Sequence, residues 1–261
     1  MLTPACAAIV VLFGGALAGG VRASLQTAPG DGSSLEAWRS VLGDPAFADA
    51  LGFSLWIAAA ATALSTVLAV ALAAALRGRG AVLRGLAALP VPVPHLVVAV
   101  GAVLWLGPGG LVDRAVGALP VQLVRDPAGL GVILVYVYKE APFLALLVLA
   151  AWGREVAERE EAAATLGAGS WQRLRLVVWP AIRVPLVTGS LIVAAFVLGA
   201  FEVPLVIGPT SPQTLGTYAL DATRTADLDG QARAAASLLV AAGASVLLAL
   251  AAAWRARSLD A

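Results

Sequence analysis

Three charged side chains interrupt long apolar runs of this 261-residue sequence and could do chemistry inside a membrane. Lys139 and Glu140 adjoin near the middle of one run, and Glu202 lies toward the outer end of the next. A charge at the bilayer centre costs at least about 2.5–3.5 kcal/mol, so such residues usually face a bundle interior or water. We expect a pathway or gate site or, alternatively, a structural ion pair. Helix geometry favours a pair between Lys139 and Glu202 over one with the adjacent Glu140.

His95 follows an alternation of prolines, Pro90, Pro92 and Pro94, in the sequence LPVPVPH. A regular helix cannot hold this pattern, because each proline lacks a backbone donor and its ring clashes with the carbonyl four residues earlier. We expect extended or kinked backbone over 89–93 and a helix that restarts near Pro94. Such backbone survives in a membrane only when it is buried in protein or lines a cavity. Pro94 and His95 are therefore candidates for a translocation path, with a packing kink and a hydrogen-bonded packing histidine as the alternatives.

The composition is that of an integral membrane protein. Hydrophobic residues make up 60% of the chain, charged residues 13%, and the mean hydropathy is +0.90. The net charge of +1 argues against a nucleic-acid partner. One cysteine and one histidine predict neither a disulfide framework nor a metal site, and we find no catalytic nucleophile motif. An enzyme is therefore the weakest of the functional classes considered.

Six apolar segments are long enough to approach the roughly 20 residues that a membrane-spanning helix needs. They cover residues 5–21, 51–76, 86–106, 130–152, 184–207 and 234–254. The first lacks a basic leading region, so we interpret it as an uncleaved helix rather than a signal peptide. The expected fold is an all-α integral membrane protein with six transmembrane helices.

Basic residues predict the orientation of these spans. Arg and Lys gather between the second and third spans, between the fourth and fifth, and after the sixth, whereas the opposite loops hold most of the acids. Both termini are therefore expected in the cytoplasm, together with the loop over residues 153–183. We expect the outer loop over residues 22–50 to carry a short interfacial helix, and the loop over 208–233 to begin with turns and become weakly helical.

The 153–183 loop is charged and broken by glycine. Acids near its start and bases near its end favour a helix over 155–166. Gly167 suits a left-handed C-terminal cap, Ser170 can N-cap a second helix over 171–179, and Pro180 with Pro185 would mark the return to the membrane. The product is a helix–turn–helix at the membrane surface. An amphipathic helix bound to lipid headgroups is the alternative.

This loop resembles the EAA loop of permease subunits of binding-protein-dependent ABC importers, whose pattern is E-A-A, three residues, G, nine residues, I-x-L-P. Glu161, Ala162 and Ala163 match, and Gly167 follows after three residues. Nine residues later Val177 stands for the Ile, and Pro180 ends the pattern after Trp179 in place of the Leu. The resemblance covers roughly residues 51–254.

The resemblance implies a type I importer permease with its core over 51–254, preceded by an N-terminal helix and external loop over 1–50 and followed by a cytoplasmic tail over 255–261. In that family the EAA loop is a coupling helix that docks on an ATP-hydrolysing subunit. Glu161 and Gly167 are then the main coupling candidates, with Ala162, Ala163, Val177 and Pro180 completing the motif.

The resemblance also implies the partners. They are two ATPase copies that bind the ATP and magnesium, a second permease chain (a paralogue slightly favoured over an identical copy), an external binding protein and the lipid of a bacterial inner membrane. This chain is expected to hold no cofactor and to be no enzyme. At the turn of the loop, the sequence Leu166-Gly167-Ala168 resembles the turn of permeases for polyamines, thiamine, phosphonates, metals or oxyanions. The substrate is left open. The competing hypothesis is an ion-coupled secondary transporter that uses Lys139, Glu140 and Glu202.

Overall fold

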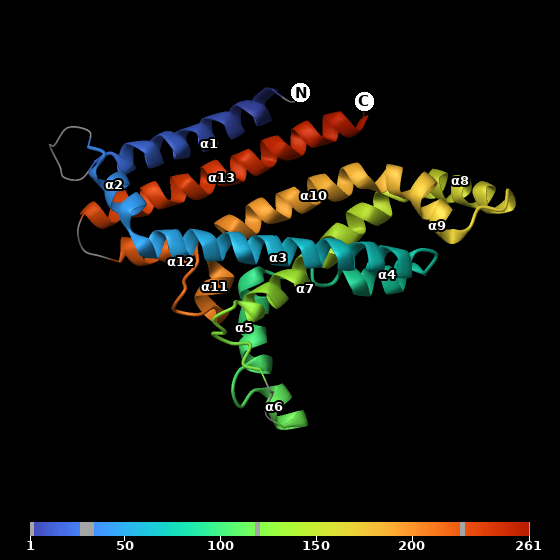
Figure 1. Ribbon diagram of the computed structural model, residues 1–261, viewed down its shortest axis with the longest axis horizontal. Helices are drawn as coiled ribbons and strands as arrows, with labels where there is room; N and C mark the ends of the chain where they lie inside the picture. Colours follow the sequence, from blue (N-terminus) through green and yellow to red (C-terminus); the bar gives the residue numbers. More distant parts are fainter. Residues whose placement is uncertain (1–2, 27–33, 118–120, 225–227, 261) are drawn as a thin grey trace.

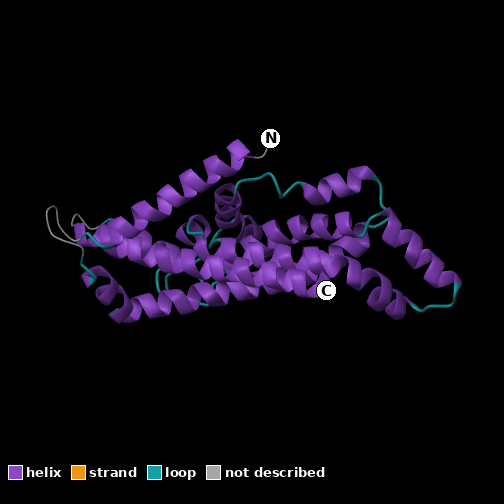
Figure 2. Cartoon of the chain, turned by 90° about the horizontal axis from the view of Figure 1, so that it is seen from above, coloured by secondary structure: helices purple, strands orange, loops and turns teal. Residues whose placement is uncertain are grey.

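The computed structural model describes residues 3–26, 34–117, 121–224 and 228–260, and in those residues the chain forms helices and no strand (Figure 2). An all-α membrane fold is therefore confirmed. In chain order the helices are α1 (Thr3–Ser24), α2 (Glu36–Gly43), α3 (Pro45–Leu76), α4 (Ala81–Ala88), α5 (His95–Leu106), α6 (Leu111–Val116), α7 (Leu130–Ala151), α8 (Arg154–Thr165), α9 (Ser170–Arg173), the π-helical η1 (Leu174–Val178), α10 (Trp179–Gly199), α11 (Glu202–Ile207), α12 (Leu215–Thr223) and α13 (Leu228–Asp260).

The long helices share one approximate direction, and they pack side by side from α7 at one side of the bundle to α1 at the other (Figure 1). α7 and α10 both pack against α3, α13 packs against α10, and α1 packs against α13. The start of α1 and the end of α13 lie toward the end of the molecule that carries α8 and α9 (Figure 1). Both ends of the described chain and the loop helices therefore lie toward one end of the bundle.

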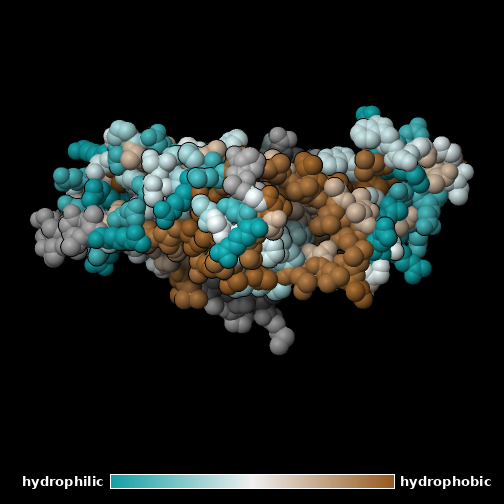
Figure 3. Space-filling model, turned by 90° about the horizontal axis from the view of Figure 1, so that it is seen from below, coloured by the Kyte–Doolittle hydropathy of each residue, from teal (hydrophilic) through white to brown (hydrophobic). Residues whose placement is uncertain are grey.

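Five helical segments are long and apolar enough to cross a membrane. They are Pro45–Leu76, His95–Val116, Leu130–Ala151, Ser170–Gly199 and Asp229–Ala251. The other expected span, residues 5–21, falls in α1, where Val11–Ser24 is a shorter apolar helix. The number of six spans is therefore not confirmed. Figure 3 shows an apolar band between two hydrophilic ends, as a membrane-spanning protein requires.

The expected third span, residues 86–106, is broken at the position where the proline alternation predicts irregular backbone. α4 ends at Ala88, residues 89–93 form turns and a bend, and α5 begins at His95 with Pro94 as its N-cap residue. α5 then runs across the direction of the long helices and leads into α6, so that both project from the bundle (Figure 1). Since α4 and α5 both contact α7, the break lies beside that helix.

The expected fifth span, residues 184–207, begins earlier and ends earlier than predicted. One continuous helical segment runs over Ser170–Gly199, and α11 follows as a separate short helix. Pro180, which together with Pro185 was expected to mark the return to the membrane, lies in the first turn of α10. Its ring would clash with the carbonyl of Leu176 in a regular helix, and the wider turn of η1 lies at that point.

α7 and α10 approach each other closely at Gly189. A Cβ atom there would lie 2.8 Å from Cδ1 of Leu147 and 2.9 Å from Cδ2 of Leu144 on α7. These distances are too short for ordinary contact, so the residue's lack of a side chain permits the approach. One turn further along α10, Val193 lies across a cavity from Glu140 of α7.

Polar contacts join helices at the end of the bundle away from α8. Asp44 caps α3 by accepting a bond from the Ala46 backbone N–H, and the Tyr218 hydroxyl donates to its other oxygen at 2.7 Å. Burial, followed by the hydrogen bond and the charge of Asp44, raises the pKa of Tyr218 to about 12. The Leu215 N–H donates to the Ser54 hydroxyl at 2.7 Å. These contacts hold α12 on α3.

The loops follow the sequence-based expectations in part. α2 is the short helix expected within residues 22–50, and α12 is the helical part expected within 208–233. Residues 27–33 and 225–227 of these two loops lie outside the described residues. The expected tail over 255–261 continues α13 as far as Asp260.

Candidate functional site

Lys139 is held by the backbone that the proline alternation leaves irregular. Its ammonium group donates to the carbonyl oxygens of Pro90, Val91 and Val93, with 2.9 Å to Val91. An ammonium has three donors, and all three are satisfied here. Lys139 is only 4% exposed. Pro94 has no N–H to offer the carbonyl of Pro90, so the lysine supplies the donor that a helix would have supplied.

The expected pair between Lys139 and Glu202 is therefore wrong. Glu202 lies in the first turn of α11, where its Oε2 accepts a bond from the Phe201 N–H at 3.3 Å. Charge complementarity pointed to the carboxylate, but the break supplies three carbonyl dipoles that complete the coordination of the ammonium. Hydrogen bonds of this kind reduce the cost of burying the ammonium.

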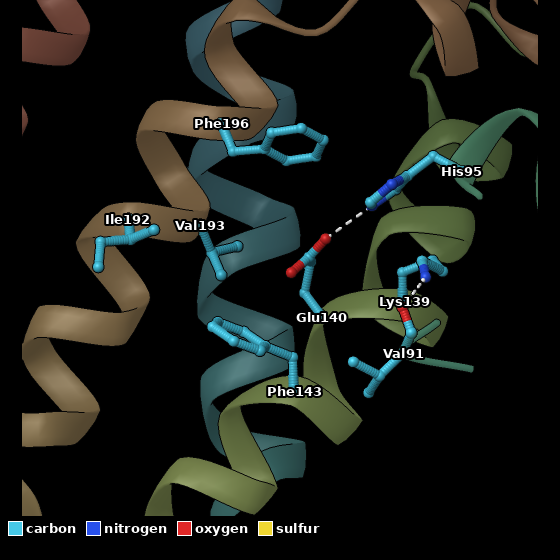
Figure 4. Close-up of a pocket in the computed structure, with 8 residues that line it drawn as sticks. All are labelled: Val91, His95, Lys139, Glu140, Phe143, Ile192, Val193 and Phe196. Atoms are coloured by element: carbon cyan, nitrogen blue, oxygen red, sulfur yellow. Dashed lines mark hydrogen bonds and ion pairs between the residues drawn. The ribbon is translucent and has the colours of Figure 1, made fainter. Parts of the chain in front are cut away.

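Glu140 pairs with His95 instead. Nε2 of His95 lies 2.8 Å from Oε1 of Glu140, and Glu140 is 8% exposed. Aromatic rings surround the imidazole: its centroid lies 4.8 Å from the ring of Phe196 and 6.1 Å from that of Tyr136. His95 is thus hydrogen-bonded, as expected of a packing histidine, and it also faces a cavity (Figure 4).

This cavity has a volume of about 270 Å³ (Figure 4). The proline break and α5 form one wall, α7 forms the second and α10 the third. Its walls are mostly apolar and include both charged residues of α7. The lining residues are Val91, His95, Lys139, Glu140, Phe143, Ile192, Val193 and Phe196. Of the candidates for a translocation path, His95, Lys139 and Glu140 therefore meet at one cavity. Pro94 serves as the N-cap of α5, and Glu202 lies outside the lining.

The loop between α7 and α10 forms the expected helix–turn–helix. α8 ends at Thr165, and Gly167 adopts φ +86°, in the left-handed region that favours glycine. The N–H of Gly167 donates to the carbonyl of Ala164, and the N–H of Ala168 donates to that of Ala163, each at 3.0 Å. This pair of bonds is a Schellman motif, which caps the last carbonyls of a helix.

The second loop helix begins one residue earlier than expected. Gly169 is the N-cap residue of α9, and Ser170, the expected cap, is its first residue. The Gly169 N–H donates to the side-chain oxygen of Gln172 at 2.9 Å, so Gln172 satisfies a donor at the start of the helix. Ser170 instead accepts a bond from Arg173 at 3.2 Å.

The residues of the E-A-A pattern occupy one exposed surface and the helix that follows it. Glu161 and Ala162 are exposed, and Ala163 is half-buried. At the turn, Leu166 is 88% exposed and Trp171 is 70% exposed. Val177 lies in η1, and Pro180 in the first turn of α10. Large apolar side chains that stand in water at a turn are typical of a surface that another molecule covers.

A cluster that sequence reasoning missed joins the loop to the bundle. Arg77, the residue after α3, forms an ion pair with Glu160 of α8. Its guanidinium lies 4.7 Å from the ring centroid of Trp152, and the Trp152 indole N–H donates to Glu160 at 3.3 Å. We call Arg77, Trp152 and Glu160 the loop clasp. It links α3 to the end of α7 and to α8, both of which lie far from α3 in sequence.

Signals for the clasp are weak in the sequence. Arg77 is one of several basic residues that follow a span, and Glu160 is one of several acids on α8. Only the packing of α7 on α3 brings the ends of these helices together. The clasp thus connects α8 to the ends of two membrane helices.

Comparison with known proteins places the chain in a family. A family model described as the binding-protein-dependent transport system inner membrane component matches residues 67–261. The thiamine transport system permease protein ThiP of Brucella abortus is 35% identical over 138 residues, which is 50% of this chain and 25% of that protein. This match therefore spans about a quarter of that relative's length. The molybdenum transport system permease protein ModB of Mycobacterium bovis is 30% identical over 211 residues, 78% of each chain.

Solved structures share the fold. A chain in the crystal structure of a bacterial alginate ABC transporter, in complex with an alginate pentasaccharide-bound periplasmic protein, superposes with a TM-score of 0.79 at 19% sequence identity. The match covers 97% of this chain and 91% of that chain. The family model covers most of the sequence and the architecture agrees with it. This chain therefore belongs to the binding-protein-dependent transport system inner membrane component family, the permeases of ABC importers.

Proposed function

We propose that the chain is a membrane-spanning subunit that couples ATP hydrolysis in a partner to the uptake of a small solute. α8, the Gly167 turn and α9 receive the movement of the ATPase, and the cavity beside the proline break lies on the solute's path. ATP and magnesium bind to the partner, and this chain contributes no cofactor. The family membership and the exposed loop together support this proposal.

The observation that carries the proposal is the geometry of the loop. The Schellman turn fixes α8 and α9 relative to each other, and it presents Leu166 and Trp171 to solvent on either side of Gly167. Glu161 and Ala162 lie on the same exposed loop, with Ala163 partly covered. A rigid tip with apolar side chains fits insertion into a cleft of a second protein.

The path from the loop into the membrane is continuous. The loop clasp joins α8 to α3 and to the end of α7. α7 carries Lys139 and Glu140, and α9 continues through η1, with Val177, and Pro180 into α10. α10 in turn supplies Val193 to the cavity. A displacement of the loop therefore acts on both helices that carry the cavity walls.

The assembly follows from one loop per chain. Two ATPase copies dock on two permease chains, and the second permease is a paralogue of this one. A binding protein delivers the solute to the external face. Both termini face the cytoplasm of a bacterium whose inner membrane the chain spans, which fits the position of α1 and α13 relative to α8. The relatives are named for thiamine and molybdenum transport, so the solute is small.

Uptake by the reconstituted complex tests the proposal. The chain is placed in proteoliposomes with its ATPase and binding protein, and ATP-dependent accumulation of labelled thiamine and molybdate is measured. Glu161→Lys and Gly167→Asp are expected to reduce uptake at least about tenfold while the chains remain assembled in the membrane. The first reverses a charge at the docking surface, and the second forces a side chain into the left-handed region.

Arg159→Glu is the matched control, since Arg159 lies two residues before Glu161 and therefore about 200° away around α8. It also reverses one exposed charge, and the pair of Arg159 with Glu155 lies on the surface. Uptake should stay near that of the unaltered complex. Accumulation that needs no ATPase and follows an ion gradient would refute the proposal. So would a loss of uptake that is equal in all three variants.

A further inference from the structure

The cavity beside the proline break carries an unequal distribution of charge. It has two ionisable residues from α7, Lys139 and Glu140, and His95 from α5. The rest of its lining is apolar or aromatic. Which of the two charges is available to a solute decides what kind of solute the cavity can hold.

The positive charge is already satisfied. Lys139 donates to three carbonyl oxygens, which uses every hydrogen of its ammonium group. Figure 4 shows this side chain directed to the Val91 backbone, on the side away from α10. An anionic solute would find no free donor on Lys139, and it would have to compete with carbonyl dipoles that surround the ammonium.

Hydrogen bonds satisfy only one oxygen of the Glu140 carboxylate. Among the described residues, the Glu140 side chain has one hydrogen-bond partner, His95, whose Nε2 lies 2.8 Å from its Oε1. In Figure 4 the second oxygen points away from His95, toward the α10 wall of the cavity at Val193. A buried carboxylate with a free oxygen is unfavourable unless a donor or a cation pairs with it.

Aromatic groups stand around this free oxygen. Phe143 and Phe196 line the cavity, and the Phe196 ring lies 4.8 Å from the imidazole of His95. The ring of Tyr136 packs edge-on against that of Phe196, and its buried hydroxyl has no hydrogen-bond partner among the described residues. Ring faces attract cations through their quadrupole, and a carboxylate strengthens the attraction. The cavity thus combines the two groups that recognise organic cations.

We propose that this cavity binds a small organic cation with an apolar or ring-bearing body, and that it discriminates against oxyanions. Glu140 is the specificity-determining residue, His95 positions its carboxylate, and Phe143 and Phe196 contact the body of the solute. The inference rests on the proposed function as an import permease. Among the relatives, it favours the solute class of the thiamine permease over that of the molybdenum permease.

Direct binding tests the proposal. The chain, assembled with its partner subunits in lipid nanodiscs without the binding protein, is equilibrated separately with labelled thiamine, spermidine and molybdate. At least one of the two cations should bind, and molybdate should not. Glu140→Gln should weaken cation binding about tenfold or more, because a charge-assisted bond is lost. Glu140→Asp keeps the charge and should retain part of the affinity.

Asp221→Asn is the matched control, because it also removes one carboxylate but on the exposed surface of α12. It should leave cation binding unchanged. Equal elution of all variants from a sizing column separates lost binding from lost assembly. The proposal is overturned if neither cation binds, if molybdate binds, or if Glu140→Gln binds the cation as tightly as the unaltered chain.

The two proposals fail in different ways. Glu161→Lys should abolish ATP-driven uptake yet leave cation binding in nanodiscs intact, since α8 lies at one end of the bundle, away from α5 and the cavity beside it (Figure 1). ATP-driven uptake of molybdate that Glu161→Lys abolishes would support the import function and refute the cation site. Glu140-dependent cation binding in a complex that shows no ATP-driven uptake would do the reverse.

Discussion

Charged side chains have opposite environments in the loop over 153–183 and at the proline break over 89–94. On α8 the charges outside the loop clasp stand in water, and Arg159 pairs with Glu155 and Arg154 with Glu158 along the same helix. At the break, Lys139 is buried and held by backbone carbonyls from another part of the chain. The exposed charges are replaceable individually, whereas the buried one is part of the backbone's hydrogen bonding. Exposed ion pairs suit a surface that docks and separates. A buried lysine bound by carbonyls suits a cavity wall that keeps its shape.

The comparison predicts its largest effect at Lys139. Lys139→Met leaves the buried carbonyl of Pro90 and the partly buried carbonyls of Val91 and Val93 without their donor, and the free energy of unfolding should fall by about 3 kcal/mol. Loss of the buried charge offsets a part of the penalty. Thermal denaturation of the purified complex measures the change. Arg154→Met, which removes an exposed charge from α8, should change little, and equal losses in the two variants would remove the contrast between the regions.

The loop clasp lies between the two extremes because it is partly buried. Arg77→Ala removes both its ion pair with Glu160 and its contact with Trp152, and it should lower stability by about 1–2 kcal/mol. A double-mutant cycle with Glu160→Gln should give a coupling energy of about 1 kcal/mol. A coupling energy near zero would show that the clasp does not join the loop to α3.

The turn of the loop is sensitive to backbone conformation alone. Gly167→Ala places a Cβ where nothing lies within 4 Å, so its expected penalty of about 1 kcal/mol comes from φ +86°. Gly169→Ala, two residues later at φ −67°, should stay within about 0.5 kcal/mol. Denaturation of the two variants side by side measures the difference. A similar loss of stability in the two variants would mean that the left-handed conformation of Gly167 does not contribute to the stability of the turn.

The smallest effect is expected on the surface of α8. Arg159→Ala removes an exposed pair with Glu155 and should change stability by at most about 0.5 kcal/mol. Raising the salt concentration should abolish even this difference. A larger value that persists in salt would show that the exposed charges of α8 take part in the fold.

The sequence predicted the turn of the loop and the break in the third span because the determinants of both are local. The acids of α8, the left-handed Gly167 and the restart of a helix at His95 after Pro94 each depend on a few adjacent residues. The family resemblance rested on the same short segment. It was correct, because the pattern from Glu161 to Pro180 reflects a family that covers most of the chain.

The partners of the buried charges could not be predicted in this way. The predicted pair of Lys139 with Glu202 assumed that a buried cation pairs with an anion. The proline alternation instead leaves backbone carbonyls without helical donors, and these carbonyls accept the hydrogen bonds of Lys139. The continuity of α9 with α10 through Pro180 was missed for a related reason, since a π turn absorbs the proline. Both depend on backbone geometry and on packing between distant segments.

The central claim is that the α8–α9 loop docks on a separate ATPase rather than on lipid. In a Cys6→Ser background, Ala162→Cys places a single thiol on the exposed surface of α8. A water-soluble maleimide is added to proteoliposomes with and without the ATPase subunits, with the loop facing outward. We predict rapid labelling without the ATPase and strong protection with it. Protection by lipid alone, or labelling that the ATPase leaves unchanged, would contradict the claim.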